Sequence, residues 1–175
     1  VEEGIEIGES ESETFTDPRD GQVYKIVKIG DQIWFAENLN YESDYGSYCY
    51  EEDPENCKKF GRLYRETSHC PNGWHIPNRT EWEELINFLG GSEIAGGKMK
   101  TISGWNEPNI GATNESGFSA LPSGVAWWPA DNAFYGMGDF CAWWVSDRHQ
   151  MVINSGGENT NFYYWNDSEG ESWGA

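Results

Sequence analysis

Positive charge is scarce in this sequence. Lys and Arg number 11 against 30 Asp and Glu residues, which gives a formal net charge of −19 at pH 7. Because such a chain repels phosphate groups, we expect no nucleic-acid partner, and docking on an anionic membrane is disfavoured for the same reason. An acid excess is compatible with divalent cations, but its usual role is to keep a surface solvated.

Long apolar runs and a leader are also lacking. No stretch approaches the roughly 20 apolar residues of a membrane-spanning helix. The opening residues VEEGIEIGES do not resemble a signal peptide, so we expect that a leader has been removed. Leu, Ile and Val are modest in number beside 10 Trp, 9 Tyr, 8 Phe and 21 Gly. This composition favours a core of aromatic rings in a fold rich in loops and short strands.

Cysteine is limited to four residues, which allow three pairings if all are oxidised. Cys49 and Cys57 enclose the polar loop YEEDPEN, and zinc would require tighter spacing with more Cys or His nearby. We therefore predict a disulfide bond between these two residues, closing a surface loop in an oxidising compartment. Spacing does not decide the partners of Cys70 and Cys141.

The chain opens with an acidic, Ser-rich segment and continues as one domain. Residues 1–17 contain little to bury, and we interpret them as a flexible tether, with the domain spanning residues 18–175. Tertiary contacts could still recruit Phe15 into the domain.

The domain begins with a predicted β-hairpin. Residues 23–29 alternate in the period-two pattern of a strand. Gly30 and Asp31 supply a tight turn, and residues 32–39 return as a second strand.

The stretch CPNGWHIPNRTEWEEL combines Cys70, His75 and several acids or amides, which raises the question of a catalytic or metal cluster. Asn78 can cap a helix, and Glu81 three residues later completes a capping box. One apolar stripe follows at helical spacing: Trp82, Leu85, Ile86 and Leu89. We predict a helix over residues 79–89 and interpret Cys70 and His75 as structural frame, since a catalytic pair needs a low-pKa thiolate beside its base.

A second, shorter helix is predicted over residues 93–100. Ser92 is its expected cap, and Gly96 with Gly97 weakens it. Beyond Lys100 the sequence is rich in Gly, Asn, Ser and Trp, which indicates loops and brief strands.

Five long segments carry a family resemblance: DGQVYKIVKIGDQIWFAENLNY, SYCYEEDPENCKKFGRLY, CPNGWHIPNRTEWEEL, AGGKMKTISGW and TNESGFSALPSG. In this order they resemble the Fibrobacter succinogenes major paralogous domain, over about residues 17–146. The resemblance implies a single α+β domain of C-type-lectin-like fold, with short antiparallel strands, two helices and long loops. It also implies a secreted or outer-membrane bacterial surface protein, often with a lipid anchor upstream of the N-terminus, and a role in adhesion or glycan binding.

The resemblance bears on the remaining cysteines and on catalysis. Family members end in a strand whose cysteine pairs with the residue matching Cys70, and the sequence ends at ESWGA, where that strand is expected to begin. Cys70 then pairs with Cys141, bonds elsewhere or stays free. The fold also underlies the formylglycine-generating oxidases, which use a close pair of reactive cysteines. That pair has no counterpart on a late strand here, so we expect no enzyme and no catalytic residue.

Two triplets resemble the calcium ligands of sugar-binding C-type lectins. They lie in WNEPN (105–109) and YYWND (163–167), and the matching residues are Glu107, Asn109, Asn166 and Asp167. Oxygen ligands of this kind coordinate calcium, and sugar hydroxyls complete the shell. The triplets are farther apart in sequence than in those lectins. We therefore expect no resident cofactor and keep calcium as the alternative.

The segment VAWWPADNAFYGMGDFCAWWV (125–145) is unusually aromatic. Neighbouring residues of a strand face opposite ways, so its rings cannot all point inward. We predict a ligand-binding surface on these late loops, formed by Trp127, Trp128, Phe134, Tyr135, Trp143, Trp144, Tyr164 and Trp165. The alternative is that long loops cover the rings.

The predicted function is non-catalytic recognition or adhesion at a bacterial surface. The expected ligand is a glycan, such as a plant cell-wall polysaccharide, stacked on the exposed rings. Two alternatives remain: a structural subunit of a surface assembly, whose self-assembly or protein partner buries the rings between chains, and a calcium-dependent lectin.

Overall fold

The computed structural model describes residues 13–65, 69–128, 133–147, 149–164 and 171–173. Its regular elements, in chain order, are β1 (Glu13–Thr16), β2 (Val23–Ile29), β3 (Gln32–Phe35), β4 (Ser47–Tyr48), a 3₁₀ turn (Tyr50–Glu52), α1 (Pro54–Phe60), β5 (Leu63–Tyr64), α2 (Arg79–Phe88), α3 (Ala95–Met99), β6 (Val125–Trp128), β7 (Ala133–Tyr135), β8 (Phe140–Trp144), β9 (His149–Asn154), β10 (Thr160–Tyr164) and β11 (Glu171–Trp173). These short antiparallel strands and helices confirm the predicted α+β class. Within the described ranges, no helix is long and apolar enough to cross a membrane.

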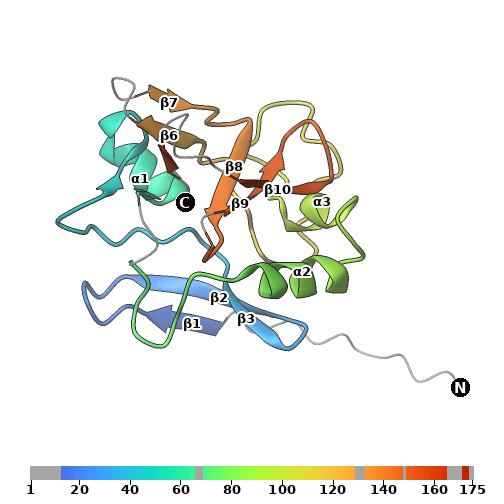
Figure 1. Cartoon of the computed structure of the whole chain (residues 1–175), viewed down its shortest axis with the longest axis horizontal. Helices are drawn as coiled ribbons and strands as arrows, with labels where there is room; N and C mark the ends of the chain where they lie inside the picture. The colour runs from blue at the N-terminus through green and yellow to red at the C-terminus, as the bar shows by residue number, and fades with distance from the viewer. Residues whose placement is uncertain (1–12, 66–68, 129–132, 148, 165–170, 174–175) are drawn as a thin grey trace, which may run out of the picture.

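The strands form small sheets at different levels of the molecule. Their orders are β1–β2–β3, β10–β9–β8, β11–β6–β7 and the pair β4–β5, all antiparallel. Figure 1 shows the β1–β2–β3 sheet at one end and α1 with β6 and β7 at the opposite end, with α2 between the two levels. The N-terminal sheet contacts the rest of the domain on both faces, because Trp34 packs on Trp82 of α2 and Phe35 packs on Trp74.

The predicted hairpin is confirmed, with β2 and β3 joined by a turn in which Gly30 has φ +62°, but its second strand ends at Phe35 rather than at residue 39. The proposed tether boundary is wrong, because Glu13–Thr16 forms β1 and pairs with β2. The physical reason is Phe15, whose ring contacts those of Phe35 and Trp74 at centroid distances of 5.7 and 5.4 Å. One half-buried ring anchors an otherwise polar strand.

Helix α2 follows its predicted local signals. The Asn78 side chain accepts from the Glu81 N–H, and the Glu81 carboxylate accepts from the Asn78 N–H, which completes the capping box. The helix ends at Phe88, and Leu89 closes it, close to the predicted boundary.

The other two helices correct the sequence interpretation. Helix α3 has Ile94 at its N-cap with no side-chain hydrogen bond, so Ser92 is not the cap; its carbonyl accepts from Thr160 of β10 instead. A third helix, α1, was not predicted, because residues 50–56 were interpreted as a polar loop. The Asp53 side chain in fact accepts from the Glu55 N–H, with proline in the first turn.

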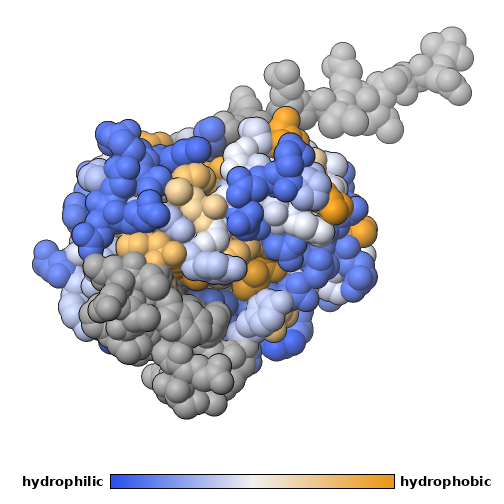
Figure 2. Space-filling model, turned by 90° about the horizontal axis from the view of Figure 1, so that it is seen from above, coloured by the Kyte–Doolittle hydropathy of each residue, from blue (hydrophilic) through white to orange (hydrophobic). Residues whose placement is uncertain are grey.

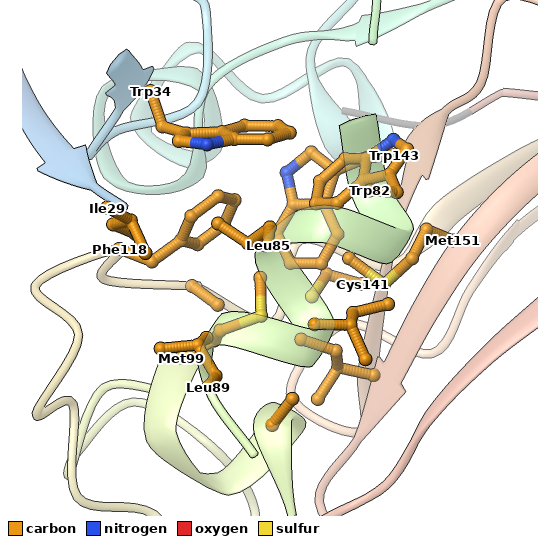
Figure 3. Packing of buried hydrophobic residues seen from close by; sticks show 14 of the residues in the cluster. Ile29, Trp34, Trp82, Leu85, Leu89, Met99, Phe118, Cys141, Trp143 and Met151 are labelled. Atoms are coloured by element: carbon orange, nitrogen blue, oxygen red, sulfur yellow. The ribbon is translucent and has the colours of Figure 1, made fainter. Parts of the chain in front are cut away.

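The main core gathers around Trp82 of α2, which is 1% exposed. Its ring lies 4.7 Å from that of Trp34, 6.0 Å from Phe118 and 6.1 Å from Trp143. Figure 3 shows Trp34 at one end of this cluster and Leu89 and Met99 at the other. Rings from four separate segments thus meet at one place, which explains how a chain poor in aliphatic residues builds an interior.

The cysteine predictions have two outcomes. The Cys49–Cys57 disulfide bond is confirmed. A Cys70–Cys141 bridge is wrong, because both thiols are free. Cys141 is fully buried in the core around Trp82, whereas Cys70 lines a cavity described below, so the two side chains belong to different environments.

A buried ammonium group joins three loops. Lys100 is fully buried, and its Nζ donates to the carbonyl oxygens of Ile110 (2.8 Å), Asn154 (3.1 Å) and Gly157 (2.8 Å). Burial lowers the pKa of Lys100. Three carbonyl dipoles offset the cost of removing the charge from water, so the side chain acts as an internal cross-link.

Candidate functional site

A cavity of about 460 Å³ lies along the outer edge of β3. We call it the β3 groove. It extends from β3 and the following residues to the segment 69–77 and to β8. Its aromatic walls are formed by Trp34, Phe35, Trp74, Trp82, Phe118, Trp143 and Trp144.

The position of this groove follows from strand geometry. Trp34 and Phe35 are neighbours on β3, so their side chains project from opposite faces of the sheet. Trp34 packs on Trp82, while Phe35 packs on Trp74 at a centroid distance of 4.2 Å. Both side chains nevertheless line the same cavity. A cavity bordered by both faces of one strand must run along that strand's edge.

Polar handles fix the rings that form the walls. Each indole N–H named here donates to a partner: Trp34 to Oε1 of Gln32 (3.2 Å), Trp143 to Oδ1 of Asn38 (3.0 Å) and Trp144 to the carbonyl oxygen of Tyr64 (2.8 Å). These hydrogen bonds restrict ring rotation. The groove is therefore formed before any ligand arrives, which reduces the entropy lost on binding.

The segment 69–77 is attached to the turn that follows β1 through the side chain of Arg19. Asp17 is buried and forms a bidentate pair with Arg19, with N–O distances of 2.6 and 2.9 Å. The hydrogen bonds from Arg19 hold the pKa of Asp17 below its usual value. Arg19 also donates to the carbonyl oxygen of His69 (2.7 Å) and stacks on Tyr41. Arg19 therefore holds the start of the segment 69–77, which lines the groove, against the turn that follows β1.

Two titratable groups that line the groove, Cys70 and Glu81, have pKa values shifted by their surroundings. Burial raises the pKa of the Cys70 thiol to about 11, so it stays protonated at neutral pH. Burial of Glu81 is outweighed by hydrogen bonds from Asn78 and His75, which hold the pKa of Glu81 below its usual value. Neither group has the ionisation state of a nucleophile or a general acid at neutral pH.

The predicted aromatic surface is only partly as expected. Trp143 is 8% exposed and Trp144 is half-buried, so placing this pair on an exposed loop face is wrong; both rings turn toward the groove. Phe134 is half-buried against Tyr50, at a centroid distance of 5.1 Å. The side chains of Trp127, Trp128 and Tyr164, and all of Trp165, lie outside the described residues.

Tyr135 does lie on the surface, where it is 70% exposed. Its ring rests against Phe140 at 5.7 Å. Four residues after Tyr135, the Oδ1 atom of Asp139 accepts a hydrogen bond from the side chain of Asn106 (2.9 Å), a residue distant in sequence. We call Tyr135, Phe140, Asn106 and Asp139 the Tyr135 face. Figure 2, seen from the end that carries β6 and β7, shows apolar residues gathered between hydrophilic ones.

The predicted calcium ligands are not brought together by the described residues. Glu107 is exposed, and Asn109 donates to the carbonyl oxygen of Thr101 (3.2 Å). The Oδ1 atom of Asn109 is buried without a hydrogen-bond partner. Asn166 and Asp167 lie outside the described residues. In the described ranges, no group of three or more His, Cys, Asp or Glu is placed to hold a metal ion, so a calcium site would depend on the second triplet.

The groove was not predicted from the sequence, because the residues that line it were each assigned a local structural role. Trp82 was placed in the apolar stripe of a helix, Trp34 in a strand and Trp74 in the structural frame. Each assignment is correct locally. The missing information is that β3 has β2 on one side and, among the described strands, none on the other.

The comparison with protein families identifies the chain's relatives. Residues 27–169 match the Fibrobacter succinogenes major domain. The chain belongs to this family. That result confirms the predicted family, whereas the C-type-lectin-like part of the fold stays a prediction. No curated protein and no solved structure matches the chain.

Proposed function

We propose that this domain is a non-catalytic recognition module at a bacterial cell surface, and that its ligand occupies the β3 groove. The main observation in support of a ligand site is the preformed cavity of about 460 Å³ with aromatic walls. Pockets of this size with a few fixed polar groups are the usual seats of ligands. Location at the cell surface rests on family membership and on the disulfide bond, which favours an oxidising compartment.

A neutral fluorescent dye tests this role without knowledge of the natural ligand. Prodan is apolar and uncharged, so it should enter the groove and shift its emission to the blue. Ile33 lines the groove and is 53% exposed. We expect Ile33→Glu to weaken prodan binding about tenfold, because a charge beside apolar walls is costly to desolvate.

The same sheet offers a matched control. Val23 of β2 is 59% exposed, similar to Ile33, and is not among the groove-lining residues. Val23→Glu should therefore leave prodan binding unchanged. Equal binding by the two variants, or no binding by the native domain, would contradict a ligand site in the groove.

Glycan binding is a second candidate function, and we place it on the Tyr135 face. A flat exposed ring backed by Phe140, beside the Asn106 amide and the Asp139 carboxylate, matches what a sugar needs: one apolar platform and oriented hydrogen-bonding groups. Such a site would suit a neutral polysaccharide, because the net charge of −19 repels acidic ones.

Soluble oligosaccharides test this second role. Cellohexaose and xylohexaose should bind in calorimetry, and Tyr135→Ala should weaken binding at least fivefold, a loss of about 1 kcal/mol that is typical of one ring contact. Tyr45→Ala is the control, because Tyr45 is 62% exposed and belongs to another turn. Equal affinity of the two variants would remove the Tyr135 face from consideration.

Calcium is proposed only as an addition to this glycan site. The buried, unpartnered Oδ1 of Asn109 is the observation that favours it. If calcium takes part, a chelator should abolish oligosaccharide binding, and Asn109→Asp should change the calcium requirement. Binding that persists unchanged in chelator would leave stacking as the sole source of affinity.

A further inference from the structure

The outer edge of β3 has backbone groups available for pairing. Next to the β2–β3 ladder, the Ala36 N–H donates to the Lys25 carbonyl (2.9 Å), so the backbone N–H of Ala36 points toward β2. Hydrogen-bonded pairs alternate along an antiparallel ladder. The register therefore makes Trp34 bond to β2, whereas the N–H and C=O groups of Ile33 and Phe35 point away from it. No hydrogen bond to those outward groups occurs within the described part of the chain.

These groups are not on an ordinary solvent-facing edge. Ile33 and Phe35 both line the groove, so their free donors and acceptors border an apolar cavity. A partner that fills the cavity with apolar groups alone would leave the edge unsatisfied, which is costly away from water. A partner with both apolar side chains and backbone N–H and C=O groups could fill the cavity and also hydrogen-bond to the outward groups of Ile33 and Phe35. That description fits an extended polypeptide.

We propose that the β3 groove binds an extended strand of a second polypeptide, which adds to the outer edge of β3. This inference rests on the proposed role of the groove and names its partner. Main-chain hydrogen bonds to Ile33 and Phe35 would supply affinity, and the walls would select the side chains.

The walls define the partner's sequence pattern. Side chains of an added strand alternate between the Trp34–Trp82 side and the Phe35–Trp74 side, and both sides are aromatic. The partner segment is therefore apolar at successive positions rather than at every second one. Because β3 has four residues, pairing covers about four residues, or roughly 13 Å of strand.

Charge selects the residues that flank this apolar core. Glu37 and Glu81 line the groove, and the whole domain carries a net charge of −19. Flanking Lys or Arg residues are attracted and flanking Asp or Glu residues are repelled. This condition disfavours a segment of this chain's own acidic type and favours a different polypeptide as the partner.

Synthetic peptides test the proposal directly. The probe is the capped peptide KTVFVITK, with four apolar residues between basic ends. We expect it to displace prodan from the native domain and from Val23→Glu, and to bind Ile33→Glu at least tenfold more weakly. The same peptide with proline in place of phenylalanine lacks one backbone donor and should also bind at least tenfold more weakly.

A second control peptide tests charge, and amide exchange tests pairing. ETVFVITE should bind several-fold more weakly at low salt, with a difference that narrows as salt rises. In the complex with KTVFVITK, the amides of Ile33 and Phe35 should become protected from hydrogen exchange.

The possible outcomes separate the two proposals. If prodan binds in the groove but no peptide displaces it, the groove keeps its role and the strand proposal is overturned. Displacement of prodan by cellohexaose instead of peptide would assign the groove to a glycan and would likewise overturn strand addition. Peptide binding without protection of Ile33 and Phe35 would also reject edge pairing.

Discussion

The N-terminal sheet has two outer edges that are built in opposite ways. Along β1, Glu13, Thr14 and Thr16 are exposed, so charged and hydroxyl side chains border that edge. Along β3, the edge lies in a recess between rings from α2, β8 and the segment 69–77. Polar edges discourage pairing with other chains. The β3 edge lacks that protection and is instead enclosed by aromatic side chains. This enclosure favours one specific partner over non-specific strand pairing.

The largest effect should come from removing the wall behind the β3 edge. Trp82→Ala deletes a ring that is 1% exposed, and we expect a loss of about 3–5 kcal/mol in the free energy of unfolding. Urea denaturation followed by circular dichroism measures this. Phe88→Ala, on the same helix and 66% exposed, should change stability by less than about 0.5 kcal/mol. Similar losses for both variants would show that Trp82 is not the centre of the core.

The ion pair between Asp17 and Arg19, which orients Arg19 toward the His69 carbonyl, should give the next largest effect. Asp17→Asn removes the charge that binds Arg19, and we expect a loss of about 1–3 kcal/mol at pH 7. The folded pKa of Asp17 lies below its ordinary value of about 3.8. The stabilisation is therefore complete above that value and is lost as the pH falls through the folded pKa.

This sign gives a clear pH test. The difference in stability between the native domain and Asp17→Asn should be constant from pH 7 to about pH 5 and should shrink steadily below about pH 4. Asp44→Asn, at an exposed position, is the control and should change the free energy of unfolding at pH 7 by less than about 0.5 kcal/mol. A difference that grows on acidification would contradict the assigned direction of the pKa shift.

The two strand variants used in the binding tests should have the smallest effects on stability. A change in their ligand binding can then be separated from a loss of folding. Ile33→Glu and Val23→Glu both place a carboxylate on an exposed strand position, and each should change the free energy of unfolding by less than about 0.5–1 kcal/mol. Thermal denaturation measures this. If Ile33→Glu alone unfolded the domain, its loss of prodan binding would say nothing about the groove, and Ile33→Thr would replace it.

Much of the fold could be predicted because its signals are local. The hairpin at Gly30, the capping box of Asn78 and Glu81, and the Cys49–Cys57 disulfide bond each depend on residues close in sequence. Helix α1 was missed although its signal was present, since Asp53 before a proline suits both a turn and a helix start.

The candidate site was less predictable because it depends on distant segments. Strand alternation predicted that the rings of Trp143 and Trp144 could not both point inward, and the exposed face inferred from this was wrong. It could not reveal that both rings would reach a groove beside β3, since the hydrogen bonds that hold them go to Asn38 and Tyr64. A partly buried edge strand is visible only after the sheets are assembled.

Hydrogen exchange of three neighbouring amides in the domain without ligand tests the central claim most directly. The account predicts slow exchange for Trp34, whose N–H bonds to β2, and fast exchange for Ile33 and Phe35, whose N–H groups face the open groove. Equally slow exchange at all three positions would show that the β3 edge is already paired, and the groove would then not be a vacant binding site.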